Sequence, residues 1–143
     1  MFNPRRFAIN LTASTIGVMV LDAVLSSMFR IDVSNAYTAV LPALISAMVE
    51  GQKYAEETGR RPEKAEIWRI SGVMAEIYLT VTVIFCVVLA IVSLDMRALF
   101  ANINLIILFS IFGIFTGLAL VFSRVGYGVG VKAGLKARNN NTG

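Results

Sequence analysis

Two carboxylates, Asp22 and Glu76, are the side chains best placed to do chemistry, because each lies inside a long apolar segment. Ionisable side chains are costly within a bilayer, so each is a candidate for an ion or proton site. The alternative is structural, a carboxylate satisfied by a neighbouring helix or by a cation. For Asp22 that cation is Arg97, and for Glu76 it is Arg124, near the inner end of the last apolar segment. Both interpretations stay open.

The depths of the two acids argue against a joint mechanism. Asp22 precedes Arg30 by eight residues, about 12 Å of helix, and Glu76 follows Arg69 by seven, about 10 Å. In helices of alternating direction these acids lie near opposite faces of the membrane, too far apart for a carboxylate dyad. Asp22 also belongs to a stripe of small and polar side chains expected to face other helices, namely Asn10, Ser14, Gly17 and Ser26.

Catalysis is not expected from this composition. The chain has no histidine and a single cysteine, Cys86, so the commonest metal ligand and acid–base group is missing. It carries no nucleophile elbow, zinc-protease motif or phosphate-binding loop. We therefore predict no enzyme activity, no cofactor and no metal. Basic residues flank apolar runs instead of alternating with exposed aromatics, so nucleic acid is not an expected partner.

The apolar segments predict a membrane protein. The 143 residues are 57% hydrophobic and 15% charged, whereas soluble domains carry about 25% charged residues. Four segments stand out, at about 7–29, 35–50, 70–93 and 103–124. All but the second are long enough to cross a hydrocarbon core of about 30 Å as helices. The second is short and contains Pro42. We predict one all-α domain of four transmembrane helices.

The distribution of Lys and Arg sets the expected threading. Cytoplasmic segments of membrane proteins carry an excess of these residues near helix ends. With four crossings, both termini and a hairpin over 51–69 are cytoplasmic, and only Arg30 and Arg97 of the 13 Lys and Arg lie outside. Three crossings would leave only Arg5, Arg6 and Arg97 in the cytoplasm. The second segment is therefore predicted to span, with both termini cytoplasmic.

Local chemistry predicts the shape of the hairpin. The second helix is expected to continue to Thr58, with Gly59 in the left-handed position that ends it. Pro62 suits the first turn of the next helix. Trp68 marks the entry of that helix into the membrane interface. Residues 132–143 are expected to form a polar tail.

A glycine series marks the last apolar segment and the residues after it. Glycines at four-residue spacing let two helix backbones approach closely. The series consists of Gly113, Gly117, Gly126, Gly130 and Gly134. Packing within the same bundle and packing against another subunit are both consistent with this pattern.

One stretch carries a resemblance. Glu50-Gly51-Gln52-Lys53-Tyr54, followed by Gly59-Arg60-Arg61-Pro62 and Glu66-Ile67-Trp68, resembles the central loop of small four-span bacterial inner-membrane proteins of uncharacterised function. The resemblance implies that fold and that membrane, and no activity. We expect a non-catalytic accessory or assembly subunit that packs against a membrane partner or itself. The alternatives are a small oligomeric transporter or channel, coupled to ions or protons through Asp22 and Glu76, and a toxin-immunity-type membrane protein.

Overall fold

The computed structural model describes residues 2–29 and 36–141. Within these ranges the chain is helical, as predicted, in five elements: α1 (Pro4–Phe29), α2 (Ala36–Thr58), α3 (Lys64–Val92), α4 (Leu94–Asn102) and α5 (Leu105–Asn141). Arg30 and the last two residues of the predicted polar tail lie outside the described residues. The side chain of Ser26 lies outside them as well.

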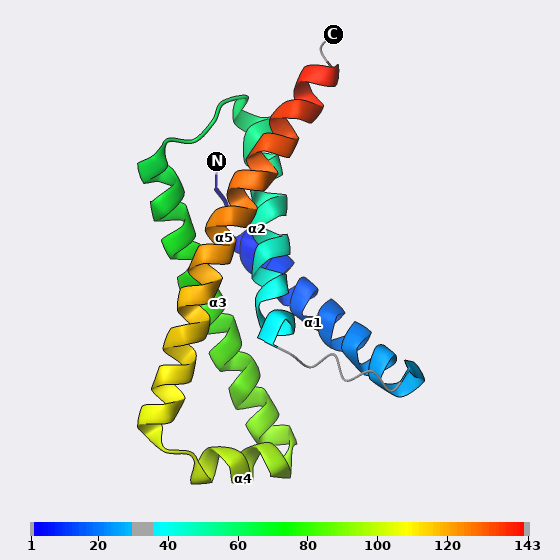
Figure 1. Ribbon diagram of the computed structural model, residues 1–143, viewed down its shortest axis with the longest axis vertical. Coiled ribbons are helices and arrows are strands. Elements are labelled where there is room, and N and C mark those ends of the chain that lie inside the picture. Colours follow the sequence, from blue (N-terminus) through cyan, green and yellow to red (C-terminus); the bar gives the residue numbers. More distant parts are fainter. Residues whose placement is uncertain (1, 30–35, 142–143) are drawn as a thin grey trace.

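Helices α2, α3 and α5 run roughly along the long axis of the molecule, α4 lies across one end and α1 runs obliquely (Figure 1). The turn after α2 and the C-terminus lie at one end, and α4 joins α3 to α5 at the other. Helices α2 and α5 form the most extensive pair, followed by α3 with α5. Helix α1 starts beside α2 and then departs from the other helices toward its own C-terminal end (Figure 1).

Three helices are long and apolar enough to cross a membrane among the parts of the chain that the structure describes: α1 over Pro4–Val24, α3, and α5 over Leu105–Asn140. The protein is therefore a membrane protein by the length and composition of its helices. Helix α2 is not among the three. The 37 residues of α5 extend about 55 Å, so nearly half of this helix lies beyond a hydrocarbon core of about 30 Å.

Helices α2 and α5 pack in parallel with their backbones in contact. A Cβ atom added to Gly126 or Gly134 would lie 2.7 Å from the carbonyl oxygen of Leu44 or Gln52. Both pairs keep the 82-residue offset that also joins Arg138 to Glu56. The facing surface of α2 consists of buried small residues at four-residue spacing: Ala43, Ala47, Gly51 and Ala55. Small residues on both helices thus permit this close approach.

The offset also gives the position of α2 along the axis of α5. Residues 36–42 of α2 are level with residues 118–124 of α5, the end of the apolar segment. Residues 43–58 of α2 are level with the polar continuation of α5. That continuation is helical to Asn141 and not a separate tail. The reason is its contact with α2, where Arg138 donates from Nη1 to the carbonyl oxygen of Glu56 at 3.4 Å.

The turn between α2 and α3 follows the expected chemistry at Gly59. This glycine has φ of +65°, and its N–H donates to the carbonyl oxygen of Ala55 at 2.9 Å, which ends α2 at Thr58 as predicted. Pro62 differs from expectation, because α3 begins at Lys64. Glu63 is the N-cap, and its carbonyl oxygen accepts from Ile67 at 3.0 Å, so Pro62 lies just before the helix.

Helix α4 was not predicted, since its nine residues are too short and too polar to span. Ser93 is extended and separates α4 from α3. Arg97 of α4 then reaches back to α3, with Nε 3.4 Å from the carbonyl oxygen of Ala90 and Nη2 3.4 Å from that of Ile91. A cation at these terminal carbonyls complements the negative end of the α3 dipole.

Candidate functional site

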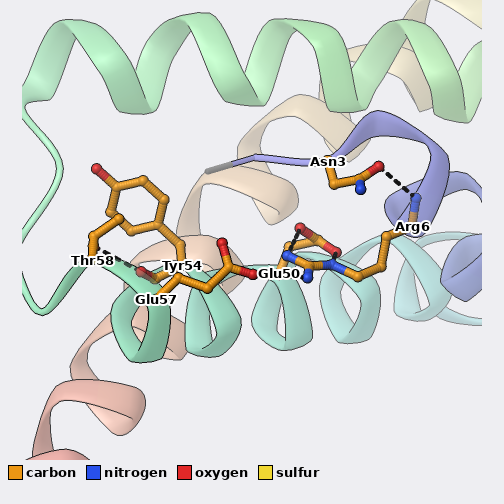
Figure 2. A network of polar contacts seen from close by, with 6 residues as sticks. All are labelled: Asn3, Arg6, Glu50, Tyr54, Glu57 and Thr58. Carbon is orange, nitrogen blue, oxygen red and sulfur yellow. Dashed lines mark hydrogen bonds and ion pairs between the residues drawn. The ribbon is translucent and has the colours of Figure 1, made fainter.

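Arg6, in the first turns of α1, lies between two carboxylates of α2. Its Nε is 2.5 Å from Glu50 Oε1 and its Nη2 is 3.1 Å from Glu50 Oε2. Its Nη1 is 3.0 Å from Glu57 Oε1. The Glu50 side chain is completely buried, whereas that of Glu57 is 44% exposed. Figure 2 shows the guanidinium directed at Glu50, while the Arg6 N–H donates to Asn3 Oδ1 at 3.2 Å.

Helical spacing and apolar packing produce this arrangement. Glu50 and Glu57 are two turns apart, which puts both carboxylates on one face of α2. Phe7 and Leu11 follow Arg6 on α1 and are fully buried in the core formed with α2 and α3. Their burial holds the start of α1 against α2. A bidentate Arg–carboxylate pair then fixes the orientation of α1 there.

A second set of contacts joins α2 to α3 and α5. The Tyr54 hydroxyl donates to Glu66 Oε1 at 3.1 Å, and Arg60 Nη2 lies 3.4 Å from Glu66 Oε2. The Tyr54 ring is buried against that of Tyr127, with centroids 5.9 Å apart. Burial raises the pKa of the Tyr54 phenol above its ordinary value, and the hydrogen bond to Glu66 adds to this. The protonated phenol is thus the form that the fold favours.

These two sets are suited to holding helices together. Glu50 and Glu66 are each paired with an arginine, and Tyr54 acts as a donor to Glu66. Sequence analysis missed this site, because it treated residues 51–69 only as a cytoplasmic hairpin and Arg6 only as a topology signal. The available signal was the seven-residue spacing of Glu50 and Glu57, with the small residue Gly51 beside Glu50.

Asp22 lies in the C-terminal half of α1, between the exposed apolar side chains of Leu21 and Val24. Its Oδ1 is shielded from solvent and has no hydrogen-bond partner among the residues that the structure describes, and the same holds for Asn10 Nδ2 on the polar stripe. Among the described residues, no ion pair joins Asp22 to Arg97, whose guanidinium lies at the end of α3. Gly17, also on the stripe, has no atom of another helix near it.

Glu76 and Arg124 are not brought together either. The Arg124 guanidinium lies over the Trp68 ring, with Cζ 4.1 Å from the centroid. Glu76 is exposed on α3, and within the described ranges it forms no ion pair. A cation over an aromatic face is stabilised without a carboxylate, which is why matching charges by depth predicted a different contact. Asp22 and Glu76 likewise form no contact with each other in the described part of the chain.

The glycine series divides into two groups. Gly126, Gly130 and Gly134 touch the α2 backbone, whereas Gly113 and Gly117 have no other helix within 4 Å. Gly113 instead lines an apolar cavity of about 700 Å³ between α3 and α5, closed at one end by Phe100 of α4.

Comparison of the chain with protein-family models, with curated proteins and with solved structures finds no match. The arrangement described above is therefore the ground on which a function is inferred.

Proposed function

We propose that the protein is a non-catalytic integral membrane subunit that packs its first helix against another membrane protein or a second copy of itself. The observation that carries this proposal is Asp22, whose Oδ1 has no hydrogen-bond partner among the described residues, on a stretch of α1 that carries exposed apolar side chains. A carboxylate at the centre of a helix in lipid costs about 3 kcal/mol. A polar group from a partner helix offsets that cost.

The remainder of the molecule supports a role in packing. Arg6 and Glu50 fix one end of α1 on α2, and the glycines of α5 hold α2 closely. The far part of α1 presents exposed apolar side chains around Asp22, among them Val20 and Leu21. Helix α1 is thus held firmly at one end and presents a side with both apolar and polar groups at the other.

We infer further that both termini and the turn between α2 and α3 lie on the cytoplasmic side of a bacterial inner membrane. The turn between α2 and α3 lies at the same end of the molecule as the C-terminus (Figure 1). Most of the Lys and Arg of the chain lie in residues 51–69 and 124–138, which contain this turn and the C-terminal part of α5. The resemblance of the central loop supports the same membrane. A topology reporter inserted at Gly59 and another fused after Gly143 should both report cytoplasm. An external signal from either would contradict this threading.

Purification from native membranes in mild detergent tests the packing proposal. We expect the wild type to co-purify with a stoichiometric membrane partner or with a second copy of the chain. The Asp22→Leu variant should lose this association. Asp95→Leu is the matched control, because it removes an exposed carboxylate from α4 and should leave the association unchanged. Retention of the partner by folded Asp22→Leu would refute the proposal. So would ion flux in proteoliposomes of the purified wild type that Asp22→Asn and Glu76→Gln both abolish.

A further inference from the structure

A groove of about 430 Å³ lies between α5 and the Trp68 ring of α3. Its lining is apolar toward the membrane and cationic toward the C-terminal end of α5, and contains no acidic side chain. The lining residues are Trp68, Leu120, Val121, Arg124, Val125, Gly128, Val129 and Lys132. This groove takes no part in the contacts that hold α1, α2 and α3 together, so it is a separate feature of the surface.

The two cations of the groove lack an anionic partner. Neither Arg124 nor Lys132 forms an ion pair with a carboxylate in the described part of the chain. Arg6 and Arg60, at the same end of the molecule, are both paired with glutamates. The Arg124 guanidinium makes a cation–π contact with the Trp68 ring, and its N–H groups donate to no described residue. The groove therefore carries two uncompensated positive charges.

Gly128 opens the space between these charges. It lies four residues from Arg124 and four from Lys132, about 6 Å along the helix in each direction. A Cβ atom at Gly128 would meet no atom within 4 Å. An anionic group placed over this glycine can therefore approach the helix backbone and reach both cations. Arg and Lys are the usual donors to phosphate oxygens.

The depth of the groove identifies the kind of anion. Arg124 follows Leu105, the start of α5, by 19 residues, about 29 Å, which matches the hydrocarbon thickness. Arg124 thus lies at the hydrocarbon edge and Gly128 about 6 Å further out, at the level of lipid headgroups. Leu120 and Val121 lie on the hydrocarbon side. The groove is arranged in the same order as a phospholipid, with apolar groups inward and charge outward.

We propose that this groove binds an anionic phospholipid of the bilayer, with its phosphate over Gly128 between Arg124 and Lys132 and its acyl chains along Leu120 and Val121. Basic pockets beside transmembrane helices recognise anionic headgroups in this manner. The proposal depends on the membrane location of α3 and α5 and not on the partner proposed for α1.

Trp68 is the only tryptophan of the chain and forms a wall of the groove, so its fluorescence reports the occupant directly. The protein is reconstituted in equimolar phosphatidylglycerol and phosphatidylcholine, with one lipid or the other brominated on its acyl chains. Bromine quenches only nearby indoles. We expect brominated phosphatidylglycerol to quench Trp68 more than brominated phosphatidylcholine does. The association constant for phosphatidylglycerol should be at least about fivefold higher, which is the effect of one cation at the membrane surface.

Matched variants decide the outcome. Arg124→Gln with Lys132→Gln should bring the ratio to about one, while Arg5→Gln with Lys136→Gln removes two exposed cations outside the groove and should leave it unchanged. Gly128→Leu should lower quenching by both lipids. Helix content measured by circular dichroism shows that each variant is folded. Equal quenching by the two lipids in the wild type, as expected for a protein partner in the groove, overturns the proposal. A preference for phosphatidylglycerol that survives in the Arg124→Gln, Lys132→Gln variant also overturns it. So does a wild-type preference that disappears when inorganic phosphate is added, because the site would then bind free phosphate.

Discussion

Replacing Gly130 by alanine tests the backbone contact between α2 and α5. A Cβ atom there would lie 2.8 Å from the carbonyl carbon of Met48 and 2.9 Å from its Cα. Because the obstruction is backbone, no change of side-chain rotamer relieves it. The two helices must move apart, which also loosens the contacts of Gly126 and Gly134 on the same face.

The expected magnitude follows from two opposing terms. Inserting a methyl group into a packed contact costs about 1–3 kcal/mol, and an obstruction by backbone belongs near the upper limit. Alanine favours a helix over glycine by about 1 kcal/mol. Gly130→Ala should therefore lower the free energy of unfolding by about 2 kcal/mol. Gly128→Ala, on the same helix but with no atom within 4 Å, should raise it by up to about 1 kcal/mol.

The assay is reversible unfolding by a denaturing detergent titrated into mild-detergent micelles, with helix content as the signal. Comparing the two alanine variants cancels their shared helix propensity, so the difference of about 3 kcal/mol reports the α2 contact alone. If the two variants shifted the unfolding free energy equally, the parallel packing of α2 on α5 would be refuted. Gly126→Ala and Gly134→Ala should behave like Gly130→Ala.

Two further predictions concern the polar contacts of α2. Glu50→Gln should lower the unfolding free energy by about 3 kcal/mol, since it removes the buried counter-charge of Arg6, and Glu57→Gln, half-exposed, by less than about 1 kcal/mol. Equal losses in the same assay would contradict this. Because folding raises the pKa of Tyr54 above 10.0, its contribution is complete below pH 10.0 and is lost as pH rises through the folded pKa. Tyr54→Phe should therefore flatten the alkaline loss of stability, and an unchanged slope would count against the Tyr54–Glu66 contact.

Features that depend on local chemistry were predictable from the sequence. Apolar length marked α1, α3 and α5, and Gly59 marked the end of α2, because each needs only neighbouring residues to be recognised. The contact between α2 and α5 joins residues 82 positions apart, so no local pattern fixes its direction or register. Its α5 half was visible as glycines, whereas Ala43, Ala47 and the rest of the α2 stripe were read only as a short apolar segment.

The candidate site was harder to predict than the fold. Matching charges by depth paired Asp22 with Arg97 and Glu76 with Arg124, since only carboxylates were considered as partners for the arginines. The structure satisfies Arg97 with helix-end carbonyls and Arg124 with an aromatic ring. Neither kind of partner carries a charge, so charge counting does not reveal it. Arg6 was assigned to a flanking segment, where cations serve as topology signals, and Glu50 was the last residue of the predicted second span.

The cations from which the threading is predicted therefore make different contacts in the folded chain. Arg6 is paired with Glu50 and orients α1, which carries Asp22 sixteen residues further on, about 24 Å along the helix. A small rotation at the paired end becomes a displacement of several ångströms at Asp22, so this ion pair sets where Asp22 lies. Arg124 and Lys132 form no ion pair with any carboxylate that the structure describes. The positive-inside bias counts these residues alike, and only their pairing separates the cation that holds two helices together from those for which we propose a lipid phosphate.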